Sequence, residues 1–166
     1  MALEALAASL PAYAGDLALN LASLLEEPQL TSQQKWGCFV ASAHAVATPA
    51  VVKAIEAAAA EAGLSDAAKT AAKGAAAIMA QNNIYFRALR ARLRMKIVSN
   101  PGVERDDFDL WCVAVSAIHG CPDCLDAHES NLSQRGVDPL VTQTALRIAA
   151  VVHAVSRVVA GEAAAV

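Results

Sequence analysis

No segment of this chain alternates apolar and polar residues over the length of a β-strand, and its runs of β-branched residues are short. Ala, Leu, Glu, Gln, Lys and Arg dominate instead, and these residues are strong helix formers. Pro, Gly and helix-capping residues divide the chain into separate stretches. The sequence therefore predicts an all-α fold. A length of 166 residues fits one domain, spanning residues 1–166, that can bury a hydrophobic core.

Proline, glycine and helix-capping residues also set the bounds of the individual helices. Thr31 is the expected N-cap of one, Pro122 stands in the favourable first turn of another, and Gly161 is expected to close the last. Residues 36–45 and 110–119 share a loose pattern of Trp, small apolar residues and Ala/Val-Ser-Ala, which indicates two related helical halves. The expected helices are 13–25, 31–48, 49–62, one from 65 or 66 past 81 towards 92, 106–119, 121–134 and 140–159.

Charge and composition bear on the partners of the chain. A net charge of −3 and a pI near 5.8 give no positively charged footprint for nucleic acid. The basic run 87–96 is expected to be a solvated helix face or an interface. Charged residues make up 17% of the chain, fewer than a typical soluble domain carries, so we expect an oligomer that hides part of its surface.

The sequence also predicts a compartment. Charged residues or histidine interrupt every apolar run, so no membrane span is expected. Glu4 and Asp16 stand near the N-terminus, where a signal peptide would carry positive charge. We therefore expect the cytoplasm, where cysteines stay reduced unless redox cycling is their function.

Residues 119–129 carry most of the chemical information. In a helix, the spacing of Cys121, Cys124 and His128 places the three side chains on one face. Cys121 falls at the start of that helix, where the helix dipole favours a thiolate. Cys124 lies one turn further in, and His128 can accept its proton. The first argument favours Cys121 as the attacking thiol and the second favours Cys124, so the residues alone leave both open.

Carboxylates surround this dithiol in the sequence. Asp109 lies on the preceding helix, and a helical hairpin would let it face the dithiol and orient His128. Compensation of the charge at the helix N-terminus is an equally good reason for Asp109. Asp123 stands between the cysteines, where a negative charge raises the pKa of a thiol and opposes its activation. Asp126 and Glu129 are expected to point to solvent.

The same residues also bear on chemistries other than a redox dithiol. His119, Cys121, Cys124 and His128 form a compact set of zinc ligands, which would make the chain a zinc-stabilised helical interaction module. Structural zinc sites usually draw their ligands from two separated elements, and no second cluster occurs here. Covalent haem attachment needs histidine directly after the second cysteine, where Leu125 stands. A thioredoxin fold needs βαβ units, which the helical pattern does not provide.

The remaining cysteines and two histidines are expected to be structural. Cys38 and Cys112 should behave as small buried hydrophobic residues. His44 and His153, each in an apolar helix, are expected in the core or at an interface.

Further sequence blocks occur along nearly the whole chain: Leu10-Pro-Ala-Tyr-Ala-Gly-Asp, Trp36-Gly, Ala41-Ser-Ala, Ala77-Ile-Met-Ala-Gln-Asn-Asn, Leu93-Arg-Met, Asn100-Pro-Gly, Phe108-Asp-Leu-Trp, Ala114-Val-Ser-Ala-Ile and Gly120-Cys-Pro-Asp-Cys-Leu-Asp-Ala-His-Glu. With them the sequence resembles the alkyl hydroperoxidase D (AhpD) family of the carboxymuconolactone decarboxylase-like superfamily. The Cys-x-x-Cys-x-x-x-His element belongs to the wider superfamily, and its combination with the N-terminal blocks is much more specific. A decarboxylase of that superfamily needs no Cys-x-x-Cys pair, so the two cysteines argue against that activity.

The resemblance implies an all-helical homotrimer that acts as an antioxidant, thiol-dependent alkyl hydroperoxide reductase. It implies that Cys124 attacks the hydroperoxide and becomes a sulfenic acid. Cys121 would act as proton donor and resolving thiol, giving a Cys121–Cys124 disulfide, and His128 would belong to the proton relay. Asp109 would complete the relay in place of the family's glutamate, and Asp123 stands where relatives carry histidine.

The resemblance also implies the source of electrons. No bound cofactor or metal is expected. The reductant would be a lipoyl group on a 2-oxoacid dehydrogenase component, recharged by dihydrolipoamide dehydrogenase with NADH, and an AhpC-type peroxiredoxin could receive the electrons. The connection 87–93 is expected to be shorter than in relatives. Because Asp109 and Asp123 alter the site, disulfide exchange with these partners and direct reduction of peroxide are both expected activities.

Overall fold

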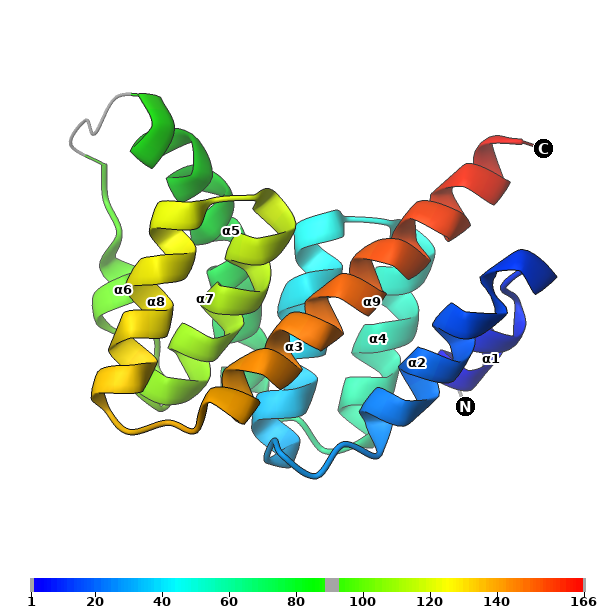
Figure 1. The fold of residues 1–166 in the computed structure, drawn as a ribbon, viewed down its shortest axis with the longest axis horizontal. Helices are drawn as coiled ribbons and strands as arrows, with labels where there is room; N and C mark the ends of the chain where they lie inside the picture. The colour runs from blue at the N-terminus through cyan, green and yellow to red at the C-terminus, as the bar shows by residue number, and fades with distance from the viewer. Residues whose placement is uncertain (1, 89–92, 166) are drawn as a thin grey trace.

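The computed structural model describes residues 2–88 and 93–165, and every regular element in them is a helix (Figure 1), which confirms the all-α class. The elements are α1 (Ala2–Ala8), a 3₁₀ turn η1 (Ala12–Ala14), α2 (Gly15–Leu25), α3 (Ser32–Val46), α4 (Pro49–Glu61), α5 (Asp66–Ala88), α6 (Lys96–Ser99), α7 (Arg105–His119), α8 (Pro122–Gln134) and α9 (Pro139–Ala164).

The helices follow the sequence prediction with three differences. Neither α1 nor the short α6 was expected; α1 forms because Leu3 and Leu6 are buried against the rest of the molecule. Gly161 does not end α9, since a single glycine lowers helix propensity without breaking a helix. The basic run 87–96 and the shortened connection 87–93 lie partly outside the described residues, so those two predictions stay untested.

Two halves of the chain, α3–α5 and α7–α9, repeat the same sequence of helices and turns. Three pairs of residues mark equivalent positions, with the same separation in each pair: Ala47 with Gly120, Pro49 with Pro122, and Gly63 with Gly136. The first pair forms left-handed C-caps, the second opens the next helix, and the third has positive φ. The halves are related as predicted, but the register differs by one residue from the pairing of 36–45 with 110–119.

The centre of the fold is the packing of α3 against α7, with α5 and α9 each touching both (Figure 1). At Gly37 the ring of Trp111 comes so close that an added Cβ would lie 2.1 Å from it. Trp111 is fully buried, and its Nε1 donates a hydrogen bond to the carbonyl oxygen of Gln34 over 3.2 Å. The start of α3 is itself fixed by a capping box between Thr31 and Gln34. These contacts hold α7 in place, and α7 carries one side of the candidate site.

Helix α9 departs from the expectation that no segment could span a membrane. By length and apolar composition it is the one helix among the described residues that could cross a bilayer. One of its faces, which includes Ile148, Val152 and Val155, is buried in the core, and α9 packs on α3 and α7. A long apolar helix packed in the core passes the same test of length and composition.

Candidate redox site

The helical hairpin of α7 and α8 places the dithiol. Gly120 ends α7 with φ of 62°, a left-handed conformation that favours glycine, and reverses the chain. The N–H of Cys121 then donates to the carbonyl oxygen of Ser116 over 3.0 Å, and Pro122 occupies the first position of α8. Cys121 is therefore the N-cap of α8, and Cys124 lies within its first turn, as the sequence predicted.

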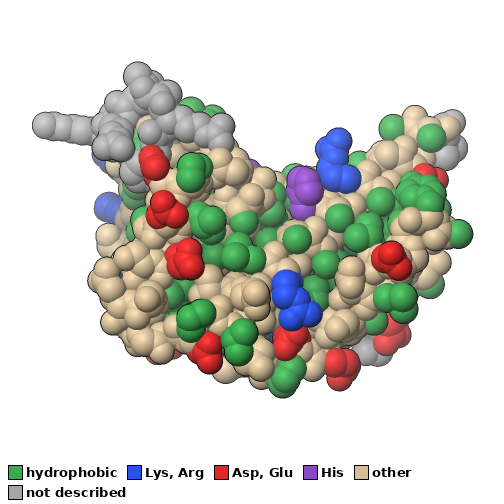
Figure 2. Space-filling view, viewed as in Figure 1, with side chains coloured by type: hydrophobic (Ala, Val, Ile, Leu, Met, Phe, Trp, Pro, Cys, Tyr) green, Lys and Arg blue, Asp and Glu red, His purple; other side chains and the backbone are tan. Residues whose placement is uncertain are grey.

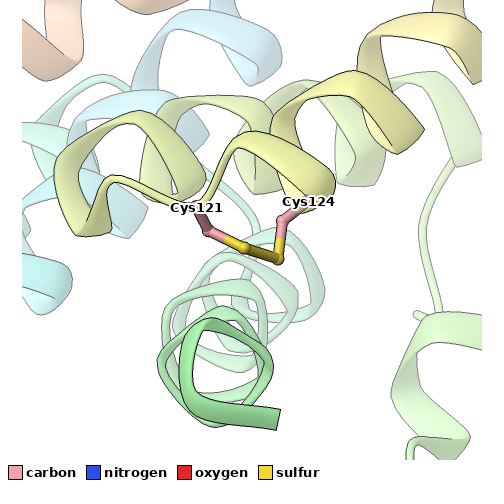
Figure 3. Close-up of a disulfide and its surroundings, with 2 residues drawn as sticks. All are labelled: Cys121 and Cys124. Carbon is pink, nitrogen blue, oxygen red and sulfur yellow. A yellow bond between two sulfur atoms is a disulfide. The ribbon is translucent and has the colours of Figure 1, made fainter. Parts of the chain in front are cut away.

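The structure joins Cys121 and Cys124 in a disulfide, with Cα atoms 5.3 Å apart. Each cysteine is 2% exposed. Figure 3 shows the sulfur atoms on the side of α8 that faces α5, and α5 and α8 are in contact. The pair can thus hold two electrons as dithiol or release them as disulfide in a site largely closed to water.

His128, one turn after Cys124 on α8, forms a buried pair with Asp109 on α7. Nδ1 of His128 lies 2.6 Å from Oδ1 of Asp109. Burial raises the pKa of the Asp109 carboxyl, but the hydrogen bonds from His128 and Arg135 outweigh it and bring the pKa below its ordinary value. An ionised carboxylate only accepts hydrogen bonds, so Nδ1 donates and Nε2 is left as the basic nitrogen of the neutral ring. The hairpin thus makes the contact that the sequence suggested between these two residues.

Arg135 is a member of the site that sequence reasoning missed. It is the C-cap of α8, and its Nη2 donates to Oδ2 of Asp109 over 2.5 Å, while its Nε donates to Oδ1 of Asp106. Two signals were available in the sequence. Asp106 and Asp109 are spaced to share one face of α7, and an antiparallel hairpin returns the end of α8 to the start of α7.

The other predicted carboxylates lie at the surface. Asp123, Asp126 and Glu129 are all exposed, as expected for the last two. Asp123 lies between the two motif cysteines, and it is exposed, whereas His128 and Asp109 are buried. Its predicted influence on the thiols stays a prediction.

Cys38 and Cys112 are free and fully buried, as predicted. Burial raises the pKa of the Cys112 thiol, and the nearby Asp109 carboxylate raises it further. Burial likewise raises the pKa of Cys38, with a contribution from Asp107. Since the thiolate is the reactive form, neither cysteine is suited to nucleophilic chemistry.

His44 and His153 do not lie in the core, which was one of the two places expected for them. His44 is partly exposed, and its Nε2 lies 2.7 Å from Oε1 of Glu56. His153 is exposed and lines a groove between α7 and α9. Both helices are less buried around these positions than their apolar composition suggested.

The zinc alternative finds no support in the geometry. Within residues 2–88 and 93–165, no group of three or more His, Cys, Asp or Glu side chains is placed to hold a metal ion. In this disulfide state the two cysteines bind each other, and Nδ1 of His128 faces Asp109.

Comparison with known proteins gives consistent matches. The carboxymuconolactone decarboxylase family matches residues 85–166. A protein named alkyl hydroperoxide reductase AhpD from Caulobacter vibrioides is 52% identical, covering 99% of this chain and 96% of that relative. Proteins of the same name from Maricaulis maris and Streptomyces avermitilis are 50% and 48% identical, each over 98% of this chain and 99% and 98% of the relative.

Proposed function

Because this chain belongs to the AhpD family, within the carboxymuconolactone decarboxylase family, we propose that it is an antioxidant oxidoreductase whose Cys121–Cys124 dithiol reduces alkyl hydroperoxides. The observation that carries the proposal is the arrangement on α8. Cys121 and Cys124 are spaced for a disulfide, and α8 also carries His128. Nδ1 of His128 contacts the buried Asp109 carboxylate, which leaves Nε2 as the nitrogen that can accept a proton.

The proposed reaction balances with these residues alone and one hydroperoxide. Cys124 loses its proton to His128, and the thiolate attacks the outer peroxide oxygen, so the O–O bond breaks and the alkoxide takes up a proton to leave as the alcohol. Cys124 is then a sulfenic acid. The Cys121 thiol attacks its sulfur, water leaves, and the disulfide forms.

A dihydrolipoyl group is the proposed reductant. Its two thiols exchange with the Cys121–Cys124 disulfide, restore the dithiol, and leave as the cyclic lipoyl disulfide. The 2% exposure of each cysteine supports a slender reactant over one that needs a wide, open site. The lipoyl group would belong to a 2-oxoacid dehydrogenase component and be recharged by dihydrolipoamide dehydrogenase with NADH.

A second candidate is a reductase adaptor that passes electrons to an AhpC-type peroxiredoxin rather than to peroxide. Cys121 favours this candidate, because as the N-cap of α8 it lies where the helix dipole supports a thiolate for attack on a partner's disulfide. The exposed carboxylate of Asp123, directly before Cys124, instead opposes formation of a thiolate at Cys124 for attack on peroxide. In either role the dithiol must be reduced in each cycle, and the reducing cytoplasm is the proposed compartment.

A coupled assay with NADH, dihydrolipoamide dehydrogenase, lipoamide and an alkyl hydroperoxide tests the proposal. The native chain is expected to support NADH oxidation, and Cys124→Ser is expected to bring it to background because the sulfenic acid cannot form. Cys112→Ala, which removes a buried free thiol outside the motif, is the matched control and should retain turnover.

The outcomes separate the candidates. Unchanged turnover in folded Cys124→Ser protein contradicts a role for the dithiol. Turnover that appears only after addition of an AhpC-type peroxiredoxin identifies the adaptor. Stoichiometric zinc in protein purified without chelator, together with no turnover, favours the zinc-stabilised module.

A further inference from the structure

We propose that Arg135 is a positioning residue of the redox site, which holds the Asp109 carboxylate in place so that His128 is oriented for proton transfer. The inference rests on the proposed function of the dithiol and names a residue that this function requires. It stands on three contacts: Arg135 with Asp106, Arg135 with Asp109, and Asp109 with His128.

The geometry divides the Asp109 carboxylate between two partners. Its Oδ1 faces Nδ1 of His128 at 2.6 Å, and its Oδ2 accepts from Nη2 of Arg135 at 2.5 Å. With both oxygens engaged, rotation of the carboxylate breaks one contact or the other. The planar guanidinium is also fixed by Asp106, which accepts from its Nε. From the end of α8, the forked N–H groups of Arg135 thus bind two carboxylates of α7.

Burial separates this pairing from an ordinary surface salt bridge. The side chain of Arg135 is 34% exposed and that of Asp106 is 41% exposed, so that contact alone contributes little. The Asp109 side chain is only 3% exposed. A buried carboxylate needs compensating partners, and Arg135 supplies a full positive charge in both protonation states of the histidine.

The charged and titratable groups around Asp109 define what removal of Arg135 does. On α7 they are Asp106 and Cys112, and on α8 they are His128 and Arg135. Burial raises the pKa of Asp109, and the hydrogen bonds from His128 and Arg135 lower it. Without the guanidinium only the hydrogen bond from His128 remains, so the pKa of Asp109 rises. Protonation of Asp109 then begins at higher pH and ends its hold on the His128 ring.

The test compares pH profiles of the reduced protein. The rate of Cys alkylation by iodoacetamide reports thiolate formation without any assumption about peroxide or electron donor, and single-turnover oxidation by cumene hydroperoxide reports the proposed reaction. In Arg135→Met we expect the acid limb of both profiles to move up by about one pH unit, so that rates on the limb fall about tenfold. Above the limb the loss should be smaller.

Two further variants separate positioning from simple stabilisation. Arg135→Lys keeps the charge without the fork, so it should leave the acid limb near its native place while lowering the rate. In an Asp109→Asn background, adding Arg135→Met should change the profile no further, since the two residues act through one path. Arg147→Met, which removes the Arg147–Glu27 ion pair elsewhere on the surface, is the control and should keep the native profile.

A native acid limb in folded Arg135→Met protein overturns the inference, as does an additive effect of the two substitutions. If Arg135→Met does not fold, a native rate and profile in Arg135→Lys overturns it instead. Failure of the proposed function looks different: native protein then shows no oxidation by cumene hydroperoxide, while the alkylation profile still reports on Arg135.

Discussion

Asp109 connects the two helices of the candidate site through one carboxylate. It lies in the first half of α7, and its partners His128 and Arg135 come from the middle and the end of α8. Its charge selects which nitrogen of His128 carries the proton. We therefore expect a change at this residue to affect the stability of the hairpin and the proposed proton relay together.

Asp109 predicts a specific pH dependence of stability. Because its pKa is lower in the folded protein, its ionised form stabilises the fold at pH values above its ordinary pKa, near 4, and this contribution is lost as the pH falls through the folded value. Asp109→Asn should therefore be less stable than the native chain at pH 6 and show a weaker loss of stability below about pH 4. Urea unfolding at pH 3 to 6 measures both.

The exposed Asp123 supplies the control for this experiment. Asp123→Asn should follow the native curve, since its side chain lies at the surface. A native slope in Asp109→Asn would show that the buried ion pairs do not set the acid sensitivity of the fold.

At the scale of helices, the close approach of α3 and α7 positions the hairpin. Gly37 allows the indole of Trp111 to lie against the backbone of α3, where a side chain would clash. The Trp111 hydrogen bond to Gln34 fixes the same contact from the other side. The position of Asp109, two residues before Trp111, depends on this packing.

Gly37→Ala tests the contact between α3 and α7. Its methyl group would lie 2.1 Å from the indole of Trp111, a rigid ring in a fully buried site, so the helices must separate. We expect a loss of about 1–3 kcal/mol in the free energy of unfolding, measured as a lower midpoint in urea with an unchanged slope.

Gly161→Ala is the matched substitution, since it lies in α9 with open space around it. It should leave stability unchanged or raise it by up to about 1 kcal/mol, because alanine favours helix. Equal midpoints for Gly37→Ala and the native chain would show that α3 and α7 can separate without cost.

At the scale of the whole molecule, the two related halves differ in chemistry. By the spacing that pairs Pro49 with Pro122, the first half has Thr48 and Val51 where the second has Cys121 and Cys124. The turn geometry is kept in both, whereas the dithiol occurs only in the second. A shared helical frame therefore does not imply a shared activity, and the proposed redox chemistry belongs to side chains on one half.

The surface of the molecule bears on its assembly. Figure 2 shows hydrophobic side chains spread over the face that carries α9 and α2, and Leu19 on α2 and Leu140 on α9 are exposed. A groove lined by residues such as Val46, Pro49 and Val159 runs between the start of α4 and the end of α9. Apolar surface of this kind is typical of subunit interfaces.

We predict a homotrimer on the basis of the family and of this surface. Light scattering coupled to size-exclusion chromatography should give a mass of three times the 17.1 kDa chain at micromolar concentration. Leu19→Lys and Leu140→Lys place a charge on the apolar face, and we expect at least one of them to lower the mass. A native chain that runs as a monomer would contradict the prediction.

Local pattern was enough to determine the fold class of this protein and to pick out Cys121 and Cys124 as its candidate redox pair. Helix propensity, capping residues and the spacing of Cys121, Cys124 and His128 depend on neighbours within a few turns, so they can be read along the chain. Asp109 was found as a candidate for the same reason, since one short turn joins its helix to the dithiol.

Tertiary structure decided what depends on residues far apart or on the depth of burial. Arg135 contacts Asp109 only because α8 runs antiparallel to α7. The register that relates the two halves is set by equivalent turns rather than by identical residues in the sequence. The exposure of His153 and the burial of both motif cysteines follow from which helix faces pack together. Packing is a property of the whole fold, and so is the environment that gives Asp109 its charge and His128 its orientation.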